Sequence, residues 1–134
     1  IGGGASGLSA AIEALRSKPD TLITIFDRMP KMGKKILATG NGRCNFSNED
    51  LSPAHFYGNS EFLKNVLTSQ YSDDEGFFRE MGMLSYHEDG RIYPRSQQAS
   101  TVREALVNAA TAPNVRFIYD TTIDSIEKKK DTFI

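Results

Sequence analysis

The sequence has few of the features that mark secreted, membrane or nucleic-acid-binding proteins. A single cysteine, Cys44, in 134 residues excludes an internal disulfide bond and suits a reducing compartment. No apolar run approaches the roughly 20 residues that a membrane-spanning helix needs. The formal net charge of −1 offers no electrostatic attraction to nucleic acid or to a membrane surface. We therefore expect a cytoplasmic protein whose partner is a small-molecule substrate, with no nucleic acid and no membrane. The sequence leaves the oligomeric state open.

Side chains suited to metal binding or thiol chemistry are also scarce. The two histidines, His55 and His87, lie far apart in the chain and lack the spacing of metal ligands. We therefore expect no metal site and interpret both as surface or hydrogen-bonded polar groups. Cys44 follows Arg43, whose charge favours a thiolate, but a free cysteine is more often a small buried packing residue. We prefer the packing interpretation.

Glycine, in contrast, is concentrated at the start of the chain. Gly2, Gly4 and Gly7 form the pattern G-x-G-x-x-G, and Asp27 follows at a spacing of about 20 residues. In this pattern the first glycine permits a tight turn, the second lets the backbone approach a pyrophosphate, and the third lets a helix pack closely. The helix N-terminus then offers N–H groups and partial positive charge, and Ser6 adds a hydroxyl. The pattern predicts a dinucleotide site with Asp27 on the adenosine ribose. The alternative for the glycines is a turn that binds no ligand, and the alternative for Asp27 is a solvated acid in a loop.

The surrounding periodicity predicts an α/β fold. Apolar residues recur at helical spacing over residues 6–16, and a β-branched run at 22–26 is typical of a buried parallel strand. We predict a Rossmann-like fold, with a central parallel sheet, helices and an added β-hairpin or antiparallel strands. Only Ile1 precedes the glycine pattern, so we expect an incomplete amino-terminal portion whose two ends cut through a sheet. No linker divides residues 1–134, which we treat as one dinucleotide-binding domain.

The remaining elements are predicted from caps and turns. A helix capped by Asn59 or Ser60 should reach about residue 70, and Asp89-Gly90 should form a type I′ hairpin turn. Capping boxes beginning at Ser72 and Thr101 each predict a helix, the first of them ending at Gly82. Strands are predicted at 115–119 and 123–127, followed by an exposed turn over 128–131.

Residues 28–48 are basic and rich in glycine. No acid occurs in this stretch, and no helical or alternating period is convincing, so we expect a largely ordered loop. Backbone N–H groups and cations of such a loop can hold phosphates, which favours a large dinucleotide over NAD alone. The alternative is a mobile surface loop with solvated charges. The basic residues are Arg28, Lys31, Lys34, Lys35 and Arg43.

The same segment carries a family resemblance. Residues 34–48 read Lys-Lys-Ile-Leu-Ala-Thr-Gly-Asn-Gly-Arg-Cys-Asn-Phe-Ser-Asn. Together with Asp89-Gly90-Arg91-Ile92-Tyr93-Pro94 and residues 98–102, this run resembles the YhiN-like bacterial flavoproteins. These are NAD(P)/FAD-dependent oxidoreductases of the two-dinucleotide-binding-domain type. The resemblance covers nearly the whole chain, and its central run is far more specific than the glycine pattern.

The resemblance implies noncovalently bound FAD and assigns residues to it by position. The pyrophosphate group would meet Gly2, Gly4, Ala5, Ser6 and Gly7, and the ribose would meet Asp27. Residues along the cofactor toward the flavin ring would be Lys34, Lys35, Thr39, Gly40, Arg43 and Asn45, with Arg28 in the same basic loop. The backbone of Ile123 would lie near adenine. Asp27 departs from the longer Glu that is common at this position, so it must sit closer or act through water.

The implied activity is an FAD-dependent oxidoreductase that transfers a hydride, with NAD(P)H as electron donor. The substrate and any catalytic acid or base are unknown, and this segment alone is expected to be inactive. Arg43 would stabilise a reduced, anionic flavin. One alternative is a non-catalytic flavin-binding module that senses redox state or assists RNA modification. A second is a domain that binds NAD only.

Overall fold

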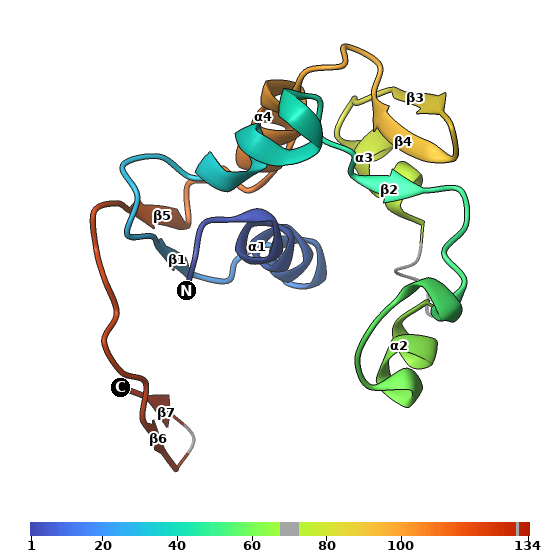
Figure 1. Cartoon of the computed structure of the whole chain (residues 1–134). Coiled ribbons are helices and arrows are strands. Elements are labelled where there is room, and N and C mark those ends of the chain that lie inside the picture. The colour runs from blue at the N-terminus through green and yellow to red at the C-terminus, as the bar shows by residue number, and fades with distance from the viewer. Residues whose placement is uncertain (68–72, 131) are drawn as a thin grey trace. The chain divides into compact units, whose positions relative to one another are not determined.

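The computed structural model describes residues 1–67, 73–130 and 132–134 (Figure 1). The chain divides into two compact units, which are described separately. The first unit comprises residues Ile1–Lys35 and Leu106–Ile134, and the second comprises Ile36–Ala105. Both lie inside the range that we predicted to be one FAD/NAD(P)-binding domain. None of the described helices is long and apolar enough to cross a membrane.

The first unit contains the predicted parallel strands. Strand β1 (Ile23–Phe26) pairs in parallel with β5 (Val115–Ile118), with Ile23 opposite Val115 and Phe26 opposite Ile118 (Figure 1). Helix α1 (Ala5–Ser17) buries the apolar face that the periodicity predicted, which consists of Leu8, Ala11 and Ile12. These elements confirm the predicted α/β class.

The carboxyl-terminal strand predicted at 123–127 is wrong. The structure has no strand there and instead forms a short antiparallel hairpin from β6 (Lys128–Lys129) and β7 (Thr132–Phe133). Glu127 and Ile134 extend the pairing, since each N–H donates to the other's carbonyl oxygen at 2.8 and 2.9 Å. A strand exists only where a second strand satisfies its backbone groups. In the described part of the chain the pairing with residues 132–134 reaches back only to Glu127. Lys128 and Lys129, which were predicted to lie in a turn, are therefore strand.

The second unit is built on a three-stranded antiparallel sheet in the order β2-β4-β3, with β2 (Ser47–Asn48), β3 (Ser85–Glu88) and β4 (Arg91–Pro94) (Figure 1). Asp89 and Gly90 join β3 to β4 with φ of 51° and 75°. Two successive positive φ angles define the type I′ turn, so the predicted hairpin is confirmed.

Two helices of the second unit begin close to their predicted caps. Helix α2 (Ser60–Leu67) begins after Asn59, whose side-chain oxygen accepts from the Phe62 N–H at 2.9 Å. The rest of the predicted helix, up to residue 70, and the proposed cap Ser72 lie outside the described residues. Helix α3 (Asp74–Glu80) is capped by Asp73, which accepts from the Gly76 N–H at 2.7 Å. Gly82 follows it with φ of 81°, as predicted for a helix stop.

Two predictions about helices need correction. Helix α4 (Ala99–Ala109) begins at Ala99, so Thr101 lies within its first turn and does not cap it. Ala99 is 2% exposed, and its burial extends the helix beyond the local capping signal. Residues 34–42, expected to be loop, form the 3₁₀ segment η1 (Lys34–Gly42), interrupted by non-helical angles at residues 39–41. Short 3₁₀ turns need no apolar period, which explains why the pattern did not indicate one. A second short 3₁₀ turn, η2, spans Pro53–His55.

Candidate functional site

The glycine turn of the first unit has the close contacts that its pattern predicts. Gly2 has φ of 91°, and its N–H donates to the carbonyl oxygen of Phe26 at 2.8 Å. A Cβ atom on Gly7 would lie 1.8 Å from the Gly2 carbonyl oxygen. No side chain fits at that separation, so helix α1 can begin against the turn only with glycine at position 7. The predicted packing role of Gly7 is thereby confirmed.

Gly4 differs from Gly7 because it faces open space. It caps α1 with φ of −83°, no side chain caps the helix, and a Cβ at Gly4 would meet no atom within 4 Å. Ala5 and Ser6 are exposed, and the first turn of α1 contains no acidic residue. The N–H groups of this turn have no intrahelical partner and carry partial positive charge. The residues present therefore fit an anion such as a pyrophosphate.

Asp27 holds the glycine turn through both carboxylate oxygens. One oxygen accepts from the Gly3 N–H at 2.6 Å, and the other accepts from the Met29 N–H at 2.8 Å. Asp27 is half-buried at the end of β1, and its own N–H donates to the carbonyl oxygen of Ile118 at 2.9 Å. A carboxylate has about four acceptor positions, so room remains for a ribose hydroxyl. The structural role of Asp27 was not predicted.

Gly3, which the pattern left unassigned, is the most enclosed residue of the turn. A Cβ atom there would lie 1.8 Å from the sulfur of Met32, itself 1% exposed. The Gly3 carbonyl oxygen also accepts from the Gly33 N–H at 2.6 Å. Gly3 thus lies against both Asp27 and Met32, with no room for a side chain. An x position in a motif carries no signal of such a requirement, so the sequence alone could not reveal it.

The other predicted residues of the first unit are solvent-facing or partly buried. Arg28, Lys34 and Lys35 are exposed, and Ile123 is half-buried in an irregular segment after β5. Within the described ranges, no hydrogen bond or ion pair joins Lys34 or Lys35 to the glycine turn. Their assignment to the cofactor stays a prediction.

The Thr39–Asn45 loop of the second unit is tightly folded. Gly40, Asn41 and Gly42 have φ of 53°, 54° and 81°, a run of left-handed residues that only glycine and asparagine adopt readily. The Cys44 N–H donates to the Thr39 carbonyl oxygen at 3.0 Å and closes the loop. The loop expected over residues 28–48 is found only at 28–33 and 43–46, on either side of the 3₁₀ segment η1, and the second stretch is held by local contacts.

Arg43 is held within the second unit. Its Nη2 donates to Glu88 Oε2 at 2.5 Å, and its guanidinium carbon lies 4.1 Å from the centre of the Tyr93 ring. The hydrogen bond to Glu88 is the main reason that the pKa of Arg43 is raised above its usual value. Neither partner was predicted, because the pairing depends on the β3–β4 hairpin.

Two more residues of this loop have structural roles. With its amide oriented to satisfy its neighbours, the Asn45 side-chain nitrogen donates to the carbonyl oxygens of Ser47 and Ile92, at 2.6 and 3.1 Å. Asn45 thereby links the loop to β2 and β4. Cys44 is 6% exposed, and burial raises the pKa of its thiol more than a hydrogen bond with Thr39 lowers it. Cys44 is therefore a packing residue, as we preferred.

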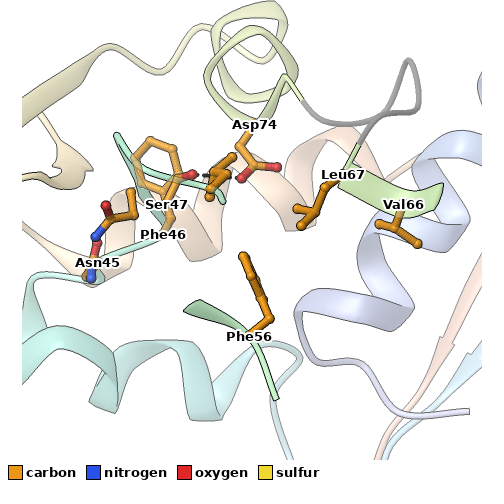
Figure 2. Close-up of a pocket in the computed structure, with 9 residues that line it drawn as sticks. Asn45, Phe46, Ser47, Phe56, Val66, Leu67 and Asp74 are labelled. Atoms are coloured by element: carbon orange, nitrogen blue, oxygen red, sulfur yellow. Dashed lines mark hydrogen bonds between the residues drawn. The ribbon is translucent and has the colours of Figure 1, made fainter. Parts of the chain in front are cut away.

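A cavity of about 310 Å³ opens in the second unit (Figure 2). Its apolar walls include Phe46, Phe56, Val66 and Leu67, and its polar edge carries the hydrogen-bonded pair Ser47 and Asp74. The volume lies at the lower end of the range for small-molecule sites. No predicted site residue except Asn45 lines this cavity.

Comparison with known proteins identifies relatives along the full length of the chain. Residues 1–134 match the family described as the HI0933-like protein Rossmann domain. The chain is 39% identical over 136 residues to a 3-dehydro-bile acid delta(4,6)-reductase of Clostridium scindens, covering 100% of this chain and 33% of that protein.

Two further relatives are named ribosomal RNA dihydrouridine synthase. The protein from Haemophilus influenzae is 30% identical, and the match covers 96% of this chain and 32% of that protein. The protein from Escherichia coli is 29% identical, and the match covers 99% of this chain and 33% of that protein. The chain thus spans about a third of the length of the curated relatives it matches. The matches confirm the predicted Rossmann-type fold and its oxidoreductase-type family.

Proposed function

The chain belongs to the HI0933-like protein Rossmann domain family, and from this membership we propose that it is the FAD-binding part of a flavin-dependent reductase. The observation that carries the proposal is the contrast between Gly7 and Gly4. Gly7 is required by the fold, whereas the space beside Gly4 is empty of protein atoms. A glycine that the fold itself does not require, at the N-terminus of an uncapped helix, supports a bound phosphate group.

Each residue of the turn has a role in the proposed complex. The N–H groups of Ala5 and Ser6 would donate to pyrophosphate oxygens, and Asp27 would accept from a ribose hydroxyl. The hydrogen bond from Gly3 keeps the Asp27 carboxylate turned toward the glycine turn at 2.6 Å. Bound FAD would supply the hydride chemistry, and the protein would bind and orient it.

The assignments in the second unit rest on the resemblance to YhiN-like flavoproteins. Thr39, Gly40, Arg43 and Asn45 would lie toward the flavin ring. Because Arg43 is paired with Glu88, its charge is partly neutralised, and its effect on a reduced flavin would be smaller than that of a free guanidinium.

The type of reaction is proposed from the names of the relatives. One is a delta(4,6)-reductase and two are dihydrouridine synthases, so each name describes a substrate that gains hydrogen. We infer that this protein likewise adds hydrogen to a carbon–carbon double bond, with a hydride from the reduced flavin and a proton from solvent or a side chain. NAD(P)H would be the source of the electrons.

Two substrate classes follow. A small unsaturated ketone is the first candidate, because the relative named as a bile acid reductase has 39% identity. Uridine in ribosomal RNA is the second, favoured by the two relatives named as dihydrouridine synthases. The net charge of −1 gives the RNA candidate no support from this segment.

The visible spectrum of the purified full-length protein is the first test, because this segment alone is expected to be inactive. A flavin spectrum, with FAD released intact on denaturation, is the expected result, and a colourless protein that binds NAD would contradict the proposal. The flavin is then reduced anaerobically with NADH or NADPH and mixed with an unsaturated steroid ketone or a uridine-containing rRNA fragment. Flavin reoxidation together with a product heavier by two hydrogens identifies the substrate class. A bound flavin that neither acceptor reoxidises would favour the non-catalytic module.

A further inference from the structure

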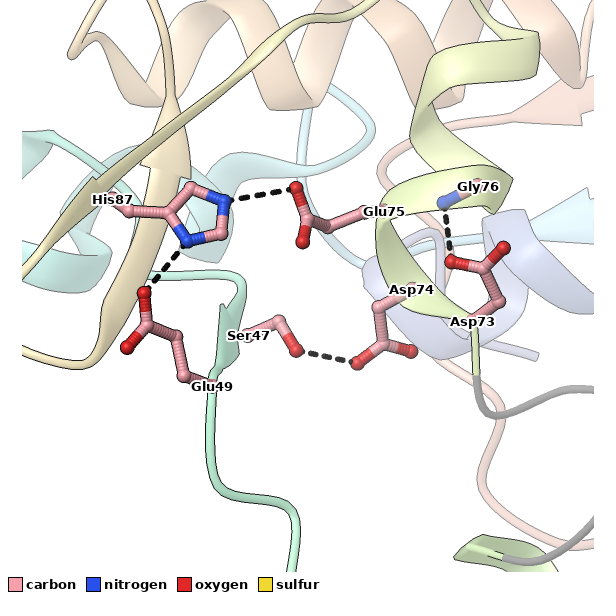
Figure 3. A network of polar contacts seen from close by, with 7 residues as sticks. All are labelled: Ser47, Glu49, Asp73, Asp74, Glu75, Gly76 and His87. Carbon is pink, nitrogen blue, oxygen red and sulfur yellow. Dashed lines mark hydrogen bonds and ion pairs between the residues drawn. The ribbon is translucent and has the colours of Figure 1, made fainter.

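His87 joins three separate elements of the second unit (Figure 3). It lies on β3 and its Nδ1 is 2.8 Å from Oε1 of Glu49, which follows β2. Its Nε2 is 3.1 Å from Oε2 of Glu75, in the first turn of α3. The ring therefore bridges two carboxylates that come from segments on either side of it.

With both glutamates ionised, this geometry requires the charged form of the histidine. A neutral imidazole has one N–H and can donate to one carboxylate, whereas the imidazolium has two N–H groups and can donate to both. The hydrogen bonds to Glu49 and then to Glu75 raise the pKa of His87, and the Ser85 hydroxyl and then His87 lower the pKa of Glu75.

The other charges near the ring do not oppose this state. On α3, Arg79 acts on Glu75 and favours its ionised form. On β3, the neighbouring Glu88 is engaged by Arg43. On β4, the residue opposite His87 is Ile92, which carries no charge.

A second contact ties the same two segments together. The Ser47 hydroxyl donates to the Asp74 carboxylate at 2.7 Å, and both residues line the cavity of the second unit (Figure 3). Ser47 lies two positions before Glu49, and Asp74 directly precedes Glu75. Two contacts therefore hold the cavity wall formed by β2 and the start of α3. One is the hydrogen bond between Ser47 and Asp74, and the other is the bridge through His87, which can gain or lose a proton.

We propose that His87 is a pH-dependent clamp, which in its protonated form joins Glu75 of α3 to Glu49 beside β2 and fixes this wall of the cavity. The clamp is complete at acidic pH, as long as both glutamates are ionised. As the pH rises through the folded-state pKa of His87, the ring keeps one N–H for two carboxylates, so its average hold on Glu75 weakens and α3 loosens.

Amide hydrogen exchange in α3, corrected for the intrinsic rate at each pH, tests the proposal. In the wild-type protein the protection of the Phe77 and Phe78 amides should fall by about threefold as His87 titrates, a size typical of an exposed ion pair. An NMR titration of the His87 ring gives the pKa to which this step must correspond. A wild-type profile without a step would overturn the proposal.

Three variants separate the clamp from other pH effects. His87→Gln should show no step and the lower protection at every pH. His55→Gln is the matched control, because His55 contacts Asp50 instead, at 2.8 Å, and the step should remain. Glu49→Gln leaves the histidine in place and should shift the step to lower pH, so it tests the clamp even if His87→Gln does not fold. A step that persists in His87→Gln or does not move in Glu49→Gln would refute the clamp.

Discussion

The N–H of Gly3 donates to the Asp27 carboxylate at 2.6 Å, so the acid predicted to bind a ribose also holds the glycine turn in place. These residues lie 24 positions apart in the sequence. They meet because the end of β1 lies beside the glycine turn in space, where the Gly2 N–H donates to the Phe26 carbonyl oxygen. The proposed contact of Asp27 with the cofactor would therefore couple cofactor binding to the stability of the turn.

Replacing Asp27 tests this coupling. Asp27→Ala removes the acceptor of two backbone N–H groups, and we expect the free energy of unfolding to fall by about 1–3 kcal/mol. Asp27→Asn keeps one acceptor oxygen and should lose less. Urea denaturation without cofactor measures the effect. If Asp27→Ala were as stable as the wild type, the carboxylate would serve the ligand only.

Gly4 and Gly7 form a matched pair for separating binding from folding. A methyl group on Gly7 would clash with the Gly2 carbonyl oxygen at 1.8 Å, so Gly7→Ala should destabilise the protein by about 2–4 kcal/mol. A methyl group on Gly4 would meet no atom within 4 Å. Gly4→Ala should therefore lower the free energy of unfolding by about 1 kcal/mol or less, because alanine is a poorer N-cap than glycine. It should nevertheless weaken FAD binding at least about tenfold, because the methyl group occupies the phosphate position.

Calorimetric titration with FAD and thermal unfolding of both variants distinguish these effects. Equal FAD affinity of Gly4→Ala and the wild type would mean that no phosphate approaches the backbone at this position.

Gly40 and Gly42 offer a second pair, within the loop of the second unit. Both have positive φ. A Cβ at Gly40 would lie 2.5 Å from the backbone nitrogen of Asn45, whereas a Cβ at Gly42 would meet nothing within 4 Å. Gly42→Ala should therefore cost about 1–2 kcal/mol for its backbone conformation. Gly40→Ala should cost about 1–3 kcal/mol more because of the clash. Chemical denaturation measures both, and equal losses would show that the loop relaxes around Gly40.

Cys44 should react slowly with thiol reagents. Burial raises the pKa of its thiol, so less thiolate is present at neutral pH than for a free cysteine. We expect alkylation in the native protein to be slower than in the denatured protein by about tenfold or more, and to accelerate as the pH rises. Mass spectrometry after timed alkylation measures the rate. Fast native alkylation would restore the redox-thiol interpretation.

Much of the local structure follows from short patterns in the sequence. The α1 face, the Asp89–Gly90 turn and the Gly82 stop each depend on neighbouring residues and on backbone sterics, so spacing alone predicts them. Prediction failed where a distant partner decides the result. Among the described residues no strand pairs with residues 123–126, and the terminal hairpin begins only at Glu127. Helix α4 begins before Thr101, because Ala99 at its start is buried.

The sequence by itself determined that a glycine turn, a helix and an acid at the end of a strand occur together, because close backbone approach permits only glycine at such positions. Only the tertiary structure decided that Asp27 holds Gly3, that Glu88 engages Arg43, and that His87 lies between two glutamates. Each of these contacts joins residues 12 to 45 positions apart, and no local spacing records which side chains the folded backbone brings within hydrogen-bonding distance.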